Sequence, residues 1–270
     1  MALHLRSLLL LFPSLFPFDA LQHVSAHEMP VQLFYPESGF FDVDKLRGLA
    51  QAEIAGSPLI RRAASGDRVA AKALHVGFWP FVREFELAID RRSLPREPLR
   101  QKFEHVTGEN KRQVKSIFTG LAREVQQMRQ EEGSHAEHWR KDAHECGIPE
   151  LEAPLIPGVK QLIDSAYVPD LPTFFAVLAG TEFIAEELSA YLVRSSAFTD
   201  LFARRRWVWG EVHLIPHDDG PSHLAIDLDL ARAYTVSDDA ARESIEAAVK
   251  ATIAQFGFAA RDVATAFQVS

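Results

Sequence analysis

The sequence predicts an all-α protein that folds as one compact helical bundle. From Asp44 onward, apolar residues recur at three- and four-residue spacing, period-two alternation is rare, and Pro or Gly separates the periodic segments. A chain of 270 residues with 47% apolar residues can bury one large core. We therefore expect residues 1–43 to form an N-terminal extension and residues 44–270 to form a single helical domain.

The first half of this domain divides into helices at its Pro and Gly residues. Gly56-Ser57-Pro58 ends the first helix, Pro80 is expected to kink the second, and Gly147 stops the last. We expect these helices at Asp44–Ala55, Asp67–Arg91, Glu97–His105 and Asn110–Cys146.

The second half continues the helical pattern after a Pro-rich connection at Glu150–Gly158. A polar loop is expected at His213–Pro221, and the last helix is expected to begin at the cap Ser237-Asp238-Asp239 and to end at Phe256, followed by a tail at Ala260–Phe267. The other helices are expected at Val159–Ala166, Thr173–Ser195, Thr199–Trp209 and His223–Tyr234.

Composition narrows the possible partners and location. A net charge of −8 gives no electrostatic basis for binding nucleic acid or an anionic membrane, so a small-molecule partner is expected. The single Cys146 excludes an intramolecular disulfide. Residues 1–28 resemble a weak signal peptide, but Met29 is an alternative start. We favour that start and a cytoplasmic location, because the single cysteine gives no sign of an oxidising compartment.

One segment of the long helix carries carboxylates and imidazoles in a single stripe. Glu131, His135, His138 and Asp142 follow one another at spacings that place them on one helical face. Such a stripe can bind a metal ion. Chance is the alternative explanation, since the chain has 11 His and 37 acidic residues.

Two later segments carry further candidate ligands. Glu182 follows the apolar run Phe174–Thr181, where a carboxylate must be paired, ligated or neutral, and Glu186 lies one turn further on. His223 and Asp227 are one turn apart on an otherwise largely apolar helix, although they could also serve only to solvate its first turn. Metal sites in helical bundles combine such residues from several helices.

Together, these segments resemble the heme-oxygenase-like diiron oxidases, which share their fold with heme oxygenase, the thiaminase-II group and pyrroloquinoline-quinone synthase. The family pattern is Glu-x6-His, then Glu on a later helix, then His-x3-Asp-x2-His. Glu131-x6-His138 resembles the first part, Glu182 the second, with Glu186 as an alternative, and His223-x3-Asp227 the third. The resemblance spans about residues 44–256.

The chain departs from this pattern at one position. Leu230 stands where the last His is expected, and a leucine side chain cannot ligate iron. A nearby group could replace the missing ligand, the second iron could be weakly held or absent, or the protein could work without metal. The candidate replacements are His135, His213, His217 and Asp229.

The resemblance implies an O2-dependent non-heme iron oxidase or oxygenase with two Fe²⁺ ions, acting on a small amine- or carboxylate-bearing metabolite in a biosynthetic reaction such as N-oxygenation or oxidative cleavage. Mixed carboxylate and imidazole ligands suit iron. An electron donor and a homodimer are compatible with this function. Two alternatives remain: a metal-free enzyme or small-molecule-binding protein of the same fold, and a non-catalytic helical interaction protein.

Overall fold

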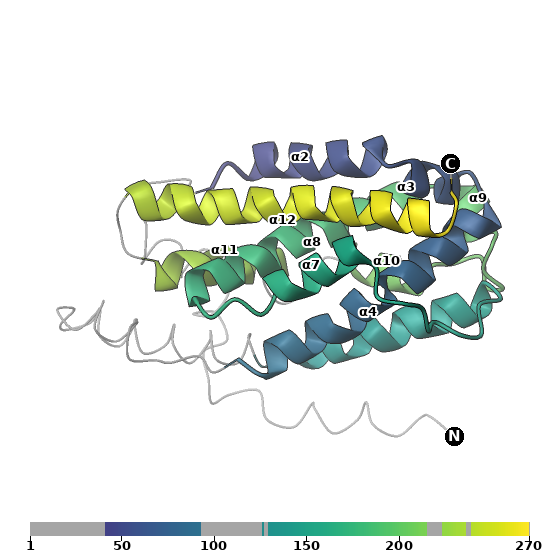
Figure 1. Cartoon of the computed structure of the whole chain (residues 1–270), viewed down its shortest axis with the longest axis horizontal. Helices are drawn as coiled ribbons and strands as arrows, with labels where there is room; N and C mark the ends of the chain where they lie inside the picture. The colour runs from purple at the N-terminus through teal and green to yellow at the C-terminus, as the bar shows by residue number, and fades with distance from the viewer. Residues whose placement is uncertain (1–40, 93–125, 127–128, 215–222, 236–238, 270) are drawn as a thin grey trace, which may run out of the picture.

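The structure is a computed structural model that describes residues 41–92, 126, 129–214, 223–235 and 239–269. These residues form helices and connecting turns and contain no strand, which confirms the all-α prediction. The labelled helices of Figure 1 are α2 (Val43–Gly56), α3 (Pro58–Ala64), α4 (Arg68–Asp90), α7 (Pro157–Ser165), α8 (Leu171–Val193), α9 (Ser196–Thr199), α10 (Val208–Val212), α11 (His223–Tyr234) and α12 (Asp239–Ala266). A further helix covers residues 129–145 and is called the 129–145 helix below.

Helix α8 lies at the centre of the bundle and packs against α2, α11 and α12. Its sequence explains this position, because apolar residues surround the helix instead of forming one stripe. Asp170 caps its N-terminus by accepting a hydrogen bond from the Thr173 amide. At Gly180 an added Cβ would lie 2.7 Å from the Thr252 Cβ, so the glycine allows the close approach of α12.

The long helices run side by side along the bundle. In Figure 1, α2 and α12 lie along one edge, and α4 and the unlabelled teal 129–145 helix lie along the opposite edge. The two helices of this second pair are joined where the Trp139 indole Nε1 donates to the His75 carbonyl oxygen at 3.0 Å. This pairing fixes the 129–145 helix relative to the core.

The structure confirms some of the predicted helix boundaries and shifts others. The helix His223–Tyr234 is confirmed as predicted, and the first helix shifts by only one residue at each end. The final helix continues through the predicted tail to Ala266, because residues such as Ala260 and Val263 remain on its buried face. The predicted helix Glu97–His105 and the start of the long helix lie outside the described residues.

Two short helices differ from the prediction. Pro58 does not end the helical region; it begins α3, because proline is well suited to the first helical turn and Ser57 caps it. The predicted helix Thr199–Trp209 is wrong. The chain turns after α9, passes through Arg205 with a positive φ of 53°, and becomes helical again only at Val208.

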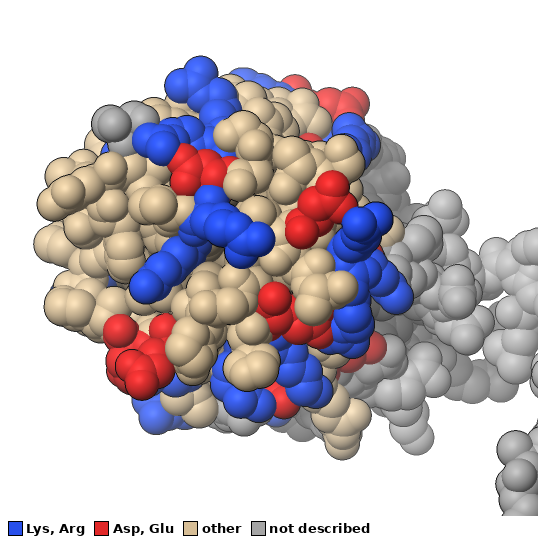
Figure 2. Space-filling view, turned by 90° about the vertical axis from the view of Figure 1, so that its right-hand side faces the viewer, with Lys and Arg blue, Asp and Glu red and all other residues tan. Residues whose placement is uncertain are grey.

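The surface carries charges of both signs. Figure 2 shows Lys and Arg side chains interspersed with Asp and Glu on the displayed face. Among the described residues, no helix is both long enough and apolar enough to cross a membrane.

Candidate metal centre

Three buried side chains from three separate helices meet inside the bundle. Glu132 comes from the 129–145 helix, Glu182 from α8 and His223 from α11. Each offers one ligand atom, and these atoms all lie within 4.8 Å of one another. Such a group of carboxylates and an imidazole has the composition of a transition-metal site.

Both ring nitrogens of His223 face carboxylates of the 129–145 helix. Nε2 lies 2.6 Å from Glu131 Oε2, and Nδ1 lies 3.0 Å from Glu132 Oε1. The Glu131 side chain is 33% exposed, whereas that of Glu132 is 5% exposed. Glu131 therefore contacts the cluster from its solvent side, and Glu132 belongs to its interior.

Two more histidines extend the cluster. His135 Nδ1 lies 3.0 Å from Glu132 Oε2, and the rings of His135 and His213 have centroids 4.4 Å apart. His213 Nδ1 lies 2.6 Å from the Trp209 carbonyl oxygen, to which it can only donate. In the neutral ring, Nε2 of His213 therefore carries the lone pair.

The surrounding carboxylates decide the proton affinity of His223. Burial alone would lower the pKa of this imidazole, but hydrogen bonds with Glu131 and Glu132 outweigh it and raise the pKa to about 11. Burial would raise the pKa of Glu132, but the positive charge of His135 and the hydrogen bonds with both histidines hold it well below its usual value. Glu132 is thus an anion between two imidazoles.

The carboxyl groups of Glu182 and Asp227 are also buried, but their surroundings raise their pKa. Burial and the charge of Glu132 raise the pKa of Glu182 to about 7. Asp227 is 1% exposed, and burial together with the charge of Glu182 raises its pKa strongly. Asp227 Oδ1 has no hydrogen-bond partner among the described residues. A buried carboxyl oxygen in this state must hold a proton or face a cation.

The donor set fits a metal ion. Glu132, Glu182 and His223 supply two carboxylates and an imidazole, and Asp227 supplies a third buried carboxyl group whose oxygen lacks a partner. A divalent cation would offset the repulsion that raises the pKa of Glu182 and Asp227. Oxygen and imidazole ligands without a thiolate suit Fe²⁺ or Mn²⁺.

The remaining sequence-predicted residues occupy different environments. His138 is half-buried; burial and the charges of His135 and Lys141 lower its pKa. Glu186, the alternative to Glu182, forms an ion pair of 2.9 Å with Arg47 of α2. Leu230 is 1% exposed and belongs to the hydrophobic core. His217 lies outside the described residues.

Sequence reasoning missed Glu132 because it treated Glu131 as the start of the polar stripe. A signal is present in the sequence: Glu132 lies seven residues, or two helical turns, before Trp139, and a large apolar side chain indicates the face that packs on the core. Trp139 is 1% exposed, so the position two turns earlier also faces inward. Adjacent helical residues differ by about 100° around the axis, and only Glu132 points into the bundle.

Asp142 has a structural contact that the stripe did not suggest. Its Oδ2 accepts a hydrogen bond of 2.7 Å from the Trp209 amide at the start of α10. Burial raises the pKa of Asp142 to about 6, although the amides of Trp209 and Val208 act in the opposite direction. Asp142 therefore caps the short helix that carries Trp209 and leads to His213.

Comparison with known proteins identifies the fold. The crystal structure of a TenA homologue from Pseudomonas syringae pv. tomato superposes with a TM-score of 0.59, covering 82% of this chain and 92% of that one. The chain has the heme-oxygenase-like TenA fold. Sequence identity to this TenA homologue is 13%, so the likeness shows the fold alone. No family model matches the sequence. No curated protein matches it either.

Proposed function

We propose that this TenA-fold chain is an O2-dependent non-heme iron oxidase or oxygenase of a small organic molecule. The observation that carries the proposal is the buried group Glu132, Glu182 and His223, whose ligand atoms lie within 4.8 Å of one another. Buried acids and imidazoles that converge from three helices are typical of iron sites in helical bundles.

The residues have distinct roles in this proposal. Glu132, Glu182 and His223 hold the metal, and Asp227 supplies a further carboxylate beside them. Hydrogen bonding of His223 Nε2 to Glu131 leaves Nδ1 on the side of Glu132, so Glu131 orients the imidazole. When bound, Fe²⁺ supplies the electrons that activate O2. A second iron, an external electron donor and a homodimer belong to the proposal as further expectations.

Protons must leave the cluster when the metal binds. The raised pKa of His223 and the raised pKa of Glu182 mean that both groups can hold protons near neutral pH. A metal ion displaces these protons, so loading is expected to be tighter at higher pH. The lone Cys146 is buried and does not belong to the candidate ligand group. A cytoplasmic location, where a thiol stays reduced, fits this proposal.

Iron loading tests the proposal directly. The full chain is purified without oxygen and loaded with Fe²⁺, and bound iron per chain and O2 uptake are measured. We expect at least one iron per chain in the wild type and its loss in Glu132→Gln. Glu137→Gln is the matched control, because Glu137 lies on the same helix but is paired with Arg140 at the surface. A wild-type protein that binds no iron overturns the proposal.

Leu230 favours a second candidate function. Where the family resemblance expects a histidine, the chain has a buried leucine of the hydrophobic core, so one ligand of a two-iron site is missing. In this alternative, the protein is a metal-free enzyme or binding protein in which His223 and its carboxylates hold an organic ligand. Absence of iron binding, together with binding of an organic molecule that depends on His223, would favour it.

A further inference from the structure

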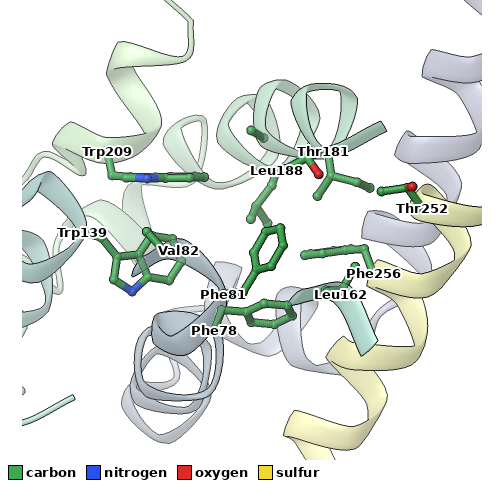
Figure 3. A pocket seen from close by; sticks show the side chains of 12 residues that line it. Phe78, Phe81, Val82, Trp139, Leu162, Thr181, Leu188, Trp209, Thr252 and Phe256 are labelled. Carbon is green, nitrogen blue, oxygen red and sulfur yellow. The ribbon is translucent and has the colours of Figure 1, made fainter. Parts of the chain in front are cut away.

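An apolar pocket lies beside the candidate metal centre. Its walls include five aromatic side chains from four helical segments, and aliphatic side chains of α4, α7 and α8 together with two threonines complete them (Figure 3). The aromatic residues are Phe78, Phe81, Trp139, Trp209 and Phe256. In Figure 3 the two Trp side chains lie on one side of the pocket, with Phe81 between them and Phe256.

The two hydroxyl groups in the lining are already used by the helices. Thr181 Oγ1 donates to the Val177 carbonyl oxygen at 3.0 Å, and Thr252 Oγ1 donates to the Ala248 carbonyl oxygen at 3.0 Å. Each threonine is therefore expected to contribute its methyl group to the pocket rather than a polar contact. Among the residues that the structure describes, the lining contains no charged side chain.

The pocket and the metal centre share secondary-structure elements. On α8, the lining residues Thr181 and Ala185 flank Glu182, one immediately before it and one a turn after it. Trp209 also lines the pocket, and its ring centroid is 4.1 Å from that of His213. A molecule in the pocket would therefore lie next to the histidine and carboxylate cluster.

We propose that this pocket binds an uncharged hydrocarbon group of the substrate, an alkyl chain or an apolar ring, and places it beside the metal centre. This inference rests on the proposed function and narrows its substrate class. A carboxylate or ammonium group inside the pocket would lose its hydration and meet no opposite charge among the described lining residues. The Trp209 Nε1, which has no hydrogen-bond partner among them, is a single neutral donor and cannot replace the hydration of an ion. Any charged group of the substrate must therefore lie outside the pocket.

The pocket is small, which suits a short or slender apolar group. Its cavity volume is about 50 Å³, and the wider space between its walls, including the part open to solvent, is about 470 Å³. Because aromatic rings can also hold a cation through their π faces, the test must separate an apolar ligand from an ammonium ligand.

Straight-chain 1-alkanols are suitable probes for the first measurement. The full, metal-free chain is titrated by calorimetry with 1-butanol through 1-decanol. We expect the affinity to rise by about fourfold for each added methylene until the pocket is full. A parallel pair, 3,3-dimethyl-1-butanol and its cationic analogue choline, has matched shape. Preferred binding of the neutral alcohol supports the inference, and preferred binding of choline overturns it.

Paired variants locate the binding. Leu188→Phe adds volume to the pocket wall and should shorten the longest alkanol that still gains affinity, whereas Val82→Ala removes volume and should lengthen it. Leu155→Phe is the matched control, because Leu155 is 48% exposed and lies outside the lining. A chain-length profile that neither pocket variant changes overturns the inference.

The experiment separates this inference from the proposed function. Alkanol binding is measured without metal, and iron loading is measured without alkanol. If alkanols bind but iron does not, the pocket assignment stands and the oxidase proposal fails. If iron binds and alkanols do not, the oxidase proposal stands and the substrate class is wrong.

Discussion

Two buried histidines of this protein, His223 and His75, have different neighbours and opposite shifts of their pKa. His223 is surrounded by the carboxylates of Glu131 and Glu132, and its pKa rises to about 11. His75 is 0% exposed; burial lowers its pKa to about 4, and the hydrogen bond from Nδ1 to the Ala71 carbonyl oxygen offsets this only in part. The difference teaches that neighbours, more than burial itself, decide whether a buried imidazole is charged.

The surroundings of His75 indicate a packing role. Its ring lies among the rings of Trp139, Phe202 and Trp207, with centroid distances of 5.0, 5.8 and 6.4 Å. Nε2 has no hydrogen-bond partner among the described residues. No carboxylate of the described ranges contributes to its pKa shift, so within them this second histidine lacks the partners from which a metal site is built.

Replacing each histidine by phenylalanine should have opposite consequences for metal binding. His223→Phe removes a candidate ligand and should weaken Fe²⁺ binding by more than about 100-fold, beyond the range for outer-shell partners. His75→Phe should leave the Fe²⁺ affinity within about twofold, because His75 shares no hydrogen-bonding or ionic partner with the candidate ligands and distant sites without shared partners act independently. Competition titration with a chelator measures both. Equal affinities in the two variants would contradict the assignment of the metal centre.

The same His75→Phe variant should change the acid stability of the fold. The pKa of His75 is lowered from 6.5 to about 4, so the unfolded state binds the proton more tightly. This imidazole therefore favours unfolding as pH falls from about 6.5 towards 4, and its contribution approaches 3 kcal/mol. The variant should lose less stability than the wild type between pH 7 and 4.5.

Urea unfolding at a series of pH values measures this effect. The difference in the free energy of unfolding between wild type and variant separates the contribution of His75 from that of the other titratable groups. The expected difference at pH 4.5 is about 2 to 3 kcal/mol relative to that at pH 7. Parallel curves for the two proteins would show that His75 takes up its proton without opposing the fold.

Asp142 offers a third case, a buried acid whose Oδ2 accepts a hydrogen bond from a backbone amide while its Oδ1 has no partner among the described residues. Asp142→Ala removes the acceptor of the Trp209 amide and should lower the free energy of unfolding by about 2 kcal/mol. Asp142→Asn keeps an acceptor oxygen and should cost less than half as much. Urea unfolding at pH 7 gives both values. Equal losses would mean that the charge, rather than the hydrogen bond, stabilises α10.

The smallest expected effect concerns Glu131. If this carboxylate orients His223 without binding metal, Glu131→Gln should weaken iron binding by roughly tenfold, the range for partners that support a ligand. Glu132→Gln should weaken it far more. The two variants are compared in the same competition titration. A complete loss of iron in Glu131→Gln would make Glu131 a ligand, as the sequence spacing predicted.

The sequence was sufficient for the fold class and for helices with strong periodicity or clear caps. Glu182 and His223 could be singled out because a charged or polar residue within an apolar run must be buried with partners. Spacing from the later histidines could not decide between Glu131 and Glu132, because both lie at helical distances from them. The Trp139 position indicates the buried face, and the packing of Trp139 against α4 places Glu132 on that face.

Other errors have equally local causes. The segment after Thr199 contains good helix formers, but Arg205 adopts a positive φ there and α10 begins only where Asp142 accepts its amides. That acceptor comes from a distant part of the sequence. Which aromatic residues line the apolar pocket could not be decided from the sequence, because aromatic residues at helical spacing are more often plain core, and the packed helices show which of them border a space.

The three buried ligand candidates belong to segments that leave the ribosome at different times. Glu132 and Glu182 are synthesised before His223, and α11 must then dock against α8 before all three side chains meet. A nascent chain that ends before α11 holds only two carboxylates of the group, which repel each other when ionised. The complete ligand set therefore exists only in the folded chain, so any oxidative chemistry at this site would begin only after the polypeptide is enclosed around it.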